Sequence, residues 1–349
     1  MKYYLKKLLK GSWRIKYSYI ILKVRLLNLN IIRFINFILE VNKRKNLSIF
    51  EFEKLSKDLI FYSTEIIKES AFYGNNFVIK DIIKKNGLYG TCRIEHGYYF
   101  GNFVPARSFS VHTSLLVTYS ERRANYIKNA YEKNKEQYSC RNRAIVTVGP
   151  YISYAKGLLS QNEKEEIKRR YGNILLVFPS HSIEGVNYKY DKDEFINEID
   201  NVSKAYDSVF ICMYWKDILD NAHVDYQKRG YKIVTAGHRH DPNFINRLKD
   251  IIELSKYTMS NAVGTHIGYC VALGKAHYLF YQKQYVIGEN VEWEFRERRN
   301  NEYIRSRLEE EEEIANSFSI NSNKITELQK RIVEKYWGTN EVKIHRLDS

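Results

Sequence analysis

A regular alternation of strand-like and helix-like segments in the second half of the chain constrains the fold most strongly. Short runs rich in Ile, Val, Leu and Phe recur between longer segments with helical periodicity. The predicted strands are 144–148, 174–178, 208–213, 232–236, 257–260 and 276–280, and the predicted helices are 163–171, 192–205, 215–228, 243–254 and 264–273. This spacing is typical of a parallel sheet with helices on both faces, the doubly wound α/β layout.

The first half of the chain has fewer and shorter segments of this kind. We predict a helix over 48–71, strands at 77–80, 90–95 and 114–119, and a helix over 121–135. Gly149-Pro150 is a turn signal and marks a domain boundary near residues 145–172. The expected parts are a basic amphipathic segment (1–47), an N-terminal Rossmann-like domain (48–150), a C-terminal Rossmann-like domain (173–290) and a helical tail returning to the N-terminal domain (291–349).

Composition excludes several classes of protein. The 349 residues are 44% hydrophobic and 28% charged, which excludes a polytopic membrane protein, a fibrous protein and a largely disordered chain. The four cysteines (Cys92, Cys140, Cys212, Cys270) are scattered without a CxxC pair, so we expect buried free thiols and no metal site.

The positive charge is concentrated at the N-terminus. Net charge is +15, and residues 1–45 hold 12 of the lysines and arginines against one acid, Glu40. A nucleic-acid-binding domain would spread such charge over a folded surface and carry a recognisable motif, so we expect no nucleic-acid partner.

Residues 19–41 are rich in Ile, Leu and Phe but are interrupted by charges, which predicts an amphipathic helix and not a membrane span. Cations beside an apolar face favour an anionic membrane surface, so we expect residues 1–45 to hold the protein peripherally on the inner face of the cell membrane, in the cytoplasm. The alternative is that the apolar face packs on the protein itself.

Candidate functional residues follow the predicted strands. Ligands of an open parallel sheet bind outside the carboxyl ends of its strands. Four polar turns meet this condition: 93–98, 178–185, 236–242 and 260–268. In the last turn an apolar helix begins beside Gly264, and its unpaired N–H groups and dipole favour a phosphate, with Ser260 and Thr265 able to cap the helix or contact the ligand. A plain strand–helix turn with good caps is the alternative.

Two of the other turns carry groups suited to group transfer. His96, followed by a glycine, is a candidate general base because histidine titrates near neutral pH, and Glu95 is a candidate to orient it. His238, Arg239 and His240 place cations where a departing phosphate develops charge. We favour that function for them over metal binding, because Arg239 opposes a cation.

The segment Ser260–Lys275 resembles the loop and helix before the last strand of the C-terminal domain in GT-B glycosyltransferases, notably bacterial capsule, lipopolysaccharide and O-antigen enzymes of the Kdo-transferase-like and sialyltransferase-like types. Glu95-His96-Gly97 is similar to the His-Gly turn of glycerophosphotransferase-like and capsule enzymes. His181 and Glu184 loosely resemble the His-Pro and acidic-Gly motifs of sialyltransferase-like enzymes, although Ser182 replaces the proline.

The resemblance implies two Rossmann-like domains of GT-B type that move a sugar from a nucleotide-sugar donor to a lipid-linked glycan or glycolipid acceptor, without cofactor or metal. It implies catalytic roles for His96, Glu95, His181 and Glu184. The donor would be bound by His238, Arg239, His240, Ser260, Asn261, Gly264, Thr265 and His266. The alternatives are a polyol-phosphate transferase or nucleotide-sugar epimerase on the same fold, and a non-catalytic component of a polysaccharide assembly complex.

Overall fold

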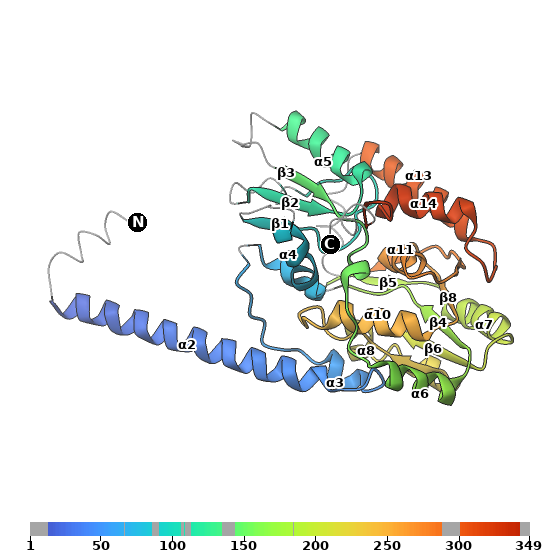
Figure 1. The fold of residues 1–349 in the computed structure, drawn as a ribbon, viewed down its shortest axis with the longest axis horizontal. Coiled ribbons are helices and arrows are strands. Elements are labelled where there is room, and N and C mark those ends of the chain that lie inside the picture. The colour runs from blue at the N-terminus through green and yellow to red at the C-terminus, as the bar shows by residue number, and fades with distance from the viewer. Residues whose placement is uncertain are drawn as a thin grey trace.

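The computed structural model describes residues 13–65, 67–85, 91–105, 108, 113–134, 144–183, 185–287 and 301–342. Two parallel sheets organise this part of the chain (Figure 1). The mixed α/β class with parallel strands is therefore confirmed.

The first sheet has the order β1-β2-β3 and all its strands are parallel. Its elements and those that precede it are α2 (Trp13–Lys45), α3 (Phe52–Ser56), η1 (Lys68–Gly74), α4 (Asn75–Lys85), β1 (Cys92–Ile94), β2 (Leu115–Thr118), α5 (Glu121–Lys133), β3 (Ala144–Thr147) and η3 (Tyr151–Tyr154).

The second sheet has the order β7-β6-β4-β8-β9, again all parallel. Its elements are α6 (Gln161–Tyr171), β4 (Ile174–Phe178), α7 (Lys192–Ser203), β6 (Ser208–Cys212), α8 (Trp215–Leu219), α9 (Val224–Lys228), β7 (Lys232–Val234), α10 (Phe244–Leu254), β8 (Tyr257–Ser260), α11 (Thr265–Ala272) and β9 (His277–Leu279). A short antiparallel pair, β5 (Asn187–Lys189) and β10 (Tyr285–Ile287), stands beside it.

The central strand β4 is buried on both faces because helices cover both sides of its sheet. Ile174 and Leu176 belong to the core that α10, α11 and the first sheet share. Leu175 and Val177 belong to a second core, formed with α7, α8 and α9. Because alternate side chains of β4 lie in two different cores, every residue of the strand is apolar. This continuous apolar run is the reason that β4 lies where the sequence predicts it.

Two predicted elements of the first half are wrong. Residues 77–80, predicted as a strand, lie in helix α4, where Ile79 and Ile83 are buried at helical spacing. The helix predicted over 48–71 is broken: α3 ends at Ser56, and η1 begins at Lys68. The carbonyls of Leu55, Lys57 and Asp58 accept hydrogen bonds from the buried Arg44 guanidinium, so they are used for tertiary contacts and do not continue the helix.

The tail helices α13 (Asn301–Phe318) and α14 (Glu327–Trp337) lie beside α5 and α11 (Figure 1). Trp337 is fully buried and stacks on Tyr98, with ring centroids 4.9 Å apart. A Cβ added to Gly268 of α11 would lie 2.2 Å from Cγ of Trp337, so glycine is needed for this close approach. The tail thus packs against both the helix that follows β8 and the turn that follows β1.

Helix α2 extends away from the rest of the molecule (Figure 1). Many of its apolar side chains are exposed: Val24, Leu29, Ile31, Ile32, Phe34, Ile35, Ile38 and Leu39. Near its C-terminus Phe37 and Arg44 are buried, and Arg44 holds the segment that follows α3. In the described part of α2, the apolar residues are therefore mostly not packed on the protein. No helix in the described residues is long and apolar enough to cross a membrane.

Candidate functional site at the carboxyl edge of the second sheet

The strand order of the second sheet indicates where a ligand is expected to bind. In chain order its strands stand 3-2-1-4-5, with the reversal between β4 and β8. The helix that follows β4 (α7) and the helix that follows β8 (α11) cover opposite faces of the sheet, which opens a crevice outside the carboxyl ends of the two strands. We call the ends of β4, β6, β7 and β8 the carboxyl edge, and all three polar turns predicted in the second half follow these strands.

At the reversal itself, two residues expected to bind the donor instead hold the edge together. The Asn261 amide is buried: Oδ1 accepts from the Ser180 N–H at 2.7 Å, and Nδ2 donates to Gln282 at 3.0 Å. The buried Ser260 hydroxyl lies 2.9 Å from Nε2 of His277 and donates to the Ala262 carbonyl at 3.2 Å. These contacts tie the turn after β4 to the turn after β8.

The amino end of α11 faces the first sheet. Thr265 Oγ1 accepts a hydrogen bond from the Tyr98 N–H at 3.2 Å. A Cβ at Gly264 would lie 2.7 Å from the His266 ring, so the space that this glycine leaves is taken by His266 and not by open crevice. The His266 ring stacks on Phe178 at 5.0 Å, and burial, with a smaller contribution from His181, lowers its pKa to about 3. His266 is therefore neutral near pH 7 and offers no positive charge to a phosphate.

At the end of β1, Glu95 and His96 point to different places, as neighbours on a strand do. The Glu95 carboxylate is buried against Arg123, with Nη2 2.7 Å from Oε1, and accepts from the Thr118 hydroxyl at 2.7 Å. The Glu95 carboxylate is thus used inside the first sheet, and its orienting of His96 stays a prediction. The His96 ring lies among aromatic rings, 5.9 Å from Phe72 and 5.9 Å from Tyr99.

The cations expected after β7 lie at the carboxyl edge. Arg239 places its guanidinium 5.3 Å from the centre of the Phe72 ring and 5.7 Å from that of Trp215. The His238 ring is buried and lies 4.2 Å from the Trp215 ring, and the His240 ring lies 5.2 Å from that of Phe72. Phe72 therefore contacts both this cluster and His96 on the other sheet.

A second connection between the candidate residues of the two sheets runs through tyrosine side chains. The exposed His181 ring packs on Tyr214 at 4.5 Å, and the Tyr214 hydroxyl lies 3.0 Å from that of Tyr73. The Tyr73 N–H donates to the Arg239 carbonyl at 2.7 Å, and its ring lies 6.2 Å from His96. We call Phe72, Tyr73, Tyr214 and Trp215 the aromatic bridge, because they join the candidate residues of both sheets. Glu184 lies outside the described residues.

Sequence reasoning missed all four bridge residues. Tyr214 and Trp215 follow β6 directly, so the strand-end argument applied to the other turns would have included them. Phe72 and Tyr73 stand before Gly74-Asn75, a turn signal between the helix predicted up to residue 71 and the strand predicted from residue 77. Tyr73 itself has φ +61°, a conformation that L residues adopt at a cost and that often marks functional sites.

A cavity of about 640 Å³ opens beside the bridge at the outer end of the carboxyl edge. Its lining comes from the turn after β7, from α8 and from residues after α3: Asp58, Leu59, Ile60, Phe61, Trp215, His238, Arg239 and His240. We call residues 55–62 the strap and this space the strap cavity.

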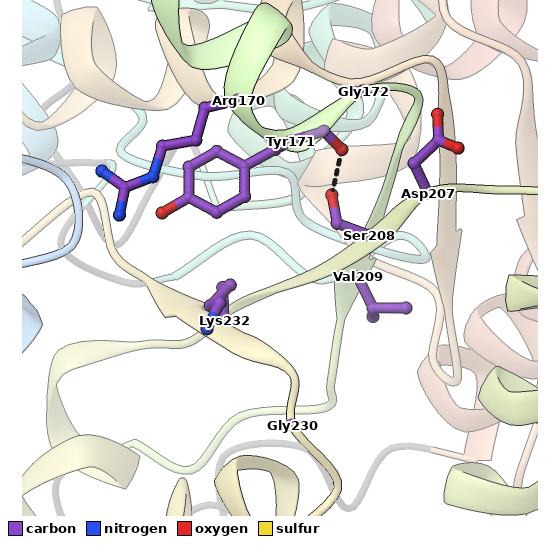
Figure 2. A pocket seen from close by; sticks show the side chains of 8 residues that line it. All are labelled: Arg170, Tyr171, Gly172, Asp207, Ser208, Val209, Gly230 and Lys232. Carbon is purple, nitrogen blue, oxygen red and sulfur yellow. Dashed lines mark hydrogen bonds between the residues drawn. The ribbon is translucent and has the colours of Figure 1, made fainter.

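A second cavity, of about 370 Å³, lies at the opposite edge of the sheet, where β4, β6 and β7 begin. Figure 2 shows Arg170, Tyr171, Asp207, Ser208 and Lys232 around it, with the Ser208 hydroxyl donating to the Tyr171 carbonyl at 2.7 Å. The topological rule for open sheets favours the carboxyl edge over this one.

Within the part of the chain that the structure describes, no three His, Cys, Asp or Glu side chains are grouped to hold a metal ion. Metal independence stays a prediction.

Comparison with known proteins gives only distant likenesses. No family model and no curated protein matches the chain. The wall teichoic acid polymerase TagF is 12% identical, covering 76% of this chain and 68% of its own, with a TM-score of 0.37. The pneumococcal O-GlcNAc transferase GtfA, solved with UDP and GlcNAc, is 10% identical over 77% of this chain and 53% of its own, with a TM-score of 0.35.

A UDP-GlcNAc 2-epimerase from Neisseria meningitidis, bound to UDP-GlcNAc, is 10% identical over 78% of this chain and 79% of its own, again with a TM-score of 0.35. At these values none of the three assigns a family or an activity to this chain.

Proposed function

We propose that this protein is a glycosyltransferase of GT-B type that moves a sugar from a nucleotide-activated donor to a surface glycan or glycolipid acceptor. The observation that carries the proposal is the convergence at the aromatic bridge. His181, Arg239 and His240 from the second sheet and His96 from the first are joined through Phe72, Tyr73 and Tyr214. Transfer between two substrates needs polar groups from two sides around one reaction centre, and this arrangement supplies them.

The donor's phosphates belong at the crevice between β4 and β8. There His181 and the amino end of α11 provide a histidine and a helix N-terminus, both suited to anions. Arg239 faces the same centre from β7, and a guanidinium stabilises the charge that develops on a leaving phosphate. We assign a supporting role, and no direct ligand contact, to Ser260, Asn261 and His266. Their polar atoms lie against other protein groups or are buried.

The contact between Tyr98 and Thr265 closes the amino end of α11 in this structure. Entry of a donor therefore requires the two sheets to part there and to close again over the substrate. Closure of this kind excludes water, which otherwise competes as the acceptor.

The test is nucleotide release from a panel of UDP-GlcNAc, GDP-mannose, CMP-N-acetylneuraminic acid and CDP-glycerol, with octyl glycosides as acceptor probes. One donor should turn over, and Arg239→Ala should slow it about 100-fold, a loss of the size seen when a group that stabilises transition-state charge is removed. Arg170→Ala, at the opposite edge of the sheet, is the matched control and should leave the rate unchanged.

The same panel separates the alternatives. Turnover of CDP-glycerol alone supports polyol-phosphate transfer, and conversion of a UDP-sugar without acceptor supports an epimerase. A non-catalytic component turns over none of the four. EDTA should leave the rate unchanged if the enzyme needs no metal.

We also place the protein on the inner surface of the cell membrane through α2. Its exposed apolar side chains and the basic residues Arg33, Lys43 and Lys45, which are exposed as well, support this location.

A further inference from the structure

The strap cavity has an exposed carboxylate on a backbone that is held in place. The Arg44 guanidinium donates to the carbonyls of Leu55, Lys57 and Asp58, at 3.0, 2.7 and 3.0 Å. The Leu55 carbonyl also accepts from the His238 N–H at 3.0 Å. The backbone on both sides of Asp58 is thus tied to buried groups, while the Asp58 side chain is 87% exposed.

His238 presents a defined nitrogen to this carboxylate. Its Nδ1 accepts a hydrogen bond from the His240 N–H at 3.2 Å, so the proton of the neutral ring is on Nε2. Nε2 lies 3.0 Å from Oδ1 of Asp58, and the ring is only 1% exposed. The ring nitrogen therefore stands beside one carboxylate oxygen of Asp58.

The walls around this carboxylate suit a sugar ring. Trp215, Phe61 and His240 line the cavity with flat rings, and Phe61 stacks on His240 at 4.3 Å. Aromatic faces pack against the apolar C–H faces of a pyranose, and a carboxylate accepts hydrogen bonds from its hydroxyls. A volume of about 640 Å³ is sufficient for such a ring.

We propose that the strap cavity is the acceptor subsite, that Asp58 is the catalytic base, and that His238 is its positioning residue; this inference rests on the proposed function. Asp58 takes the proton from the acceptor hydroxyl as that oxygen bonds to the anomeric carbon. The bond from the anomeric carbon to the phosphate oxygen breaks, and its electron pair leaves with the nucleotide toward Arg239.

His96, the base expected from the sequence, is placed differently. Its ring is surrounded by Phe72, Tyr73 and Tyr99, and it is not among the residues that line the strap cavity. Phe72 contacts the His96 ring as well as His240 and Arg239, so His96 reaches the cluster after β7 through this ring.

The experiment compares Asp58→Asn with Glu53→Gln in the full chain. Glu53 is the matched control, because it is an exposed carboxylate in α3, outside the cavity. Both variants should melt at the wild-type temperature, since both side chains are exposed. With the donor that the wild type turns over, Asp58→Asn should lower kcat about 100-fold or more, the usual contribution of a general base, and Glu53→Gln should not. The shift in melting temperature caused by the free nucleotide should be equal in all three proteins.

His238 is tested by rescue. His238→Leu should lower kcat with the KM of the donor unchanged, and His238→Gln, which keeps an N–H near the position of Nε2, should recover most of that loss. If His238 were merely structural, His238→Leu and His238→Gln would not differ from each other in melting temperature or in kcat.

The outcomes separate the two proposals. If Asp58→Asn keeps more than a third of the wild-type kcat, or His96→Ala alone abolishes turnover, Asp58 is not the base, while the proposed function stands. If the wild type binds no nucleotide and turns over no donor, the proposed function fails and this inference fails with it.

Discussion

At the scale of single residues, Tyr73 joins the two sheets at a cost in its own backbone. A non-glycine residue at φ +61° is strained, and it is held there by its N–H bond to the Arg239 carbonyl and its hydroxyl contact with Tyr214. Burial raises the pKa of the Tyr73 hydroxyl well above its usual range, so it remains neutral and acts by hydrogen bonding.

Removing one hydroxyl of this pair leaves the other buried without its partner. We expect Tyr73→Phe to lower the free energy of unfolding by about 1 kcal/mol. The double variant Tyr73→Phe/Tyr214→Phe should cost clearly less than twice that, because both partners are then apolar. Urea unfolding of the four proteins measures the coupling, and additive losses would show that the two hydroxyls do not interact.

His266 makes stability depend on pH. Burial lowers its pKa from 6.5 to about 3, so between these values the unfolded chain binds a proton that the folded chain does not. The free energy of unfolding therefore falls as the pH falls below 6.5, by at most about 1.4 kcal/mol per pH unit from this residue. Above pH 6.5 His266 has no effect on the free energy of unfolding.

His266→Phe keeps a ring against Phe178 and removes the titrating group. Near pH 7 the variant should match the wild type, and at pH 4.5 it should be more stable by about 2.7 kcal/mol. His277, whose pKa burial also lowers, is unchanged in both proteins and keeps a slope in each. Urea midpoints at the two pH values measure the difference. Parallel pH dependences would show that His266 is protonated in the folded state.

The sequence located part of the candidate site but not how its residues are used. The strand-end rule found His181, Arg239 and His240 because a parallel sheet brings such turns to one edge. It assigned Ser260, Asn261 and Glu95 to ligands or to catalysis, whereas each is paired inside the fold. Local sequence shows that a side chain is polar, but its partner comes from a strand elsewhere in the chain, so pairing cannot be predicted from the turn alone.

At the scale of elements, the contact between α11 and α14 depends on the absence of a side chain at Gly268. A methyl group there would lie 2.2 Å from the Trp337 ring, so Gly268→Ala should lower the free energy of unfolding by about 2 kcal/mol, despite the better helix propensity of alanine. The double variant Gly268→Ala/Trp337→Leu should lower the free energy of unfolding by less than the sum of the losses in the two single variants. Thermal unfolding measures both, and a Gly268→Ala protein as stable as the wild type would contradict this packing.

Helix α2 has two parts with different tasks. Its last turns hold the strap through Arg44, so a deletion that tests membrane binding must keep them. Removing residues 1–33 should abolish sedimentation with anionic liposomes and leave the melting temperature within a few degrees of the wild type. Arg44→Ala should do the opposite: it should destabilise the protein, because the carbonyls of Leu55, Lys57 and Asp58 each lose a hydrogen bond from the Arg44 guanidinium, and leave liposome binding intact.

A point-variant control addresses the apolar face of α2. Ile31→Ser/Ile35→Ser/Ile38→Ser removes one exposed stripe, and Asn36→Ala leaves it in place. Only the triple variant should lose liposome binding. Equal binding by the deletion and the wild type would exclude residues 1–33 as the membrane contact.

At the scale of the whole molecule, the second sheet was predictable and the arrangement of the first half was not. Strands such as β4, buried on both faces, produce continuous apolar runs. Residues 48–58 precede the first sheet in sequence and were expected to fold with it, yet α3 packs on α8, and the Ile49 and Leu55 carbonyls accept from the N–H groups of Thr235 and His238 beside β7. A contact of this kind, between residues 48–58 and a sheet formed much later in the chain, produces no periodic pattern in the sequence.

The account depends on the carboxyl edge of the second sheet being the place where a nucleotide binds. The most direct measurement is a crystal structure of the full chain grown with the nucleotide that raises its melting temperature most. We predict density between His181 and Thr265, with the phosphates at the amino end of α11 and Arg239 facing them. A nucleotide bound instead at the opposite edge, between Arg170 and Lys232, would contradict the account.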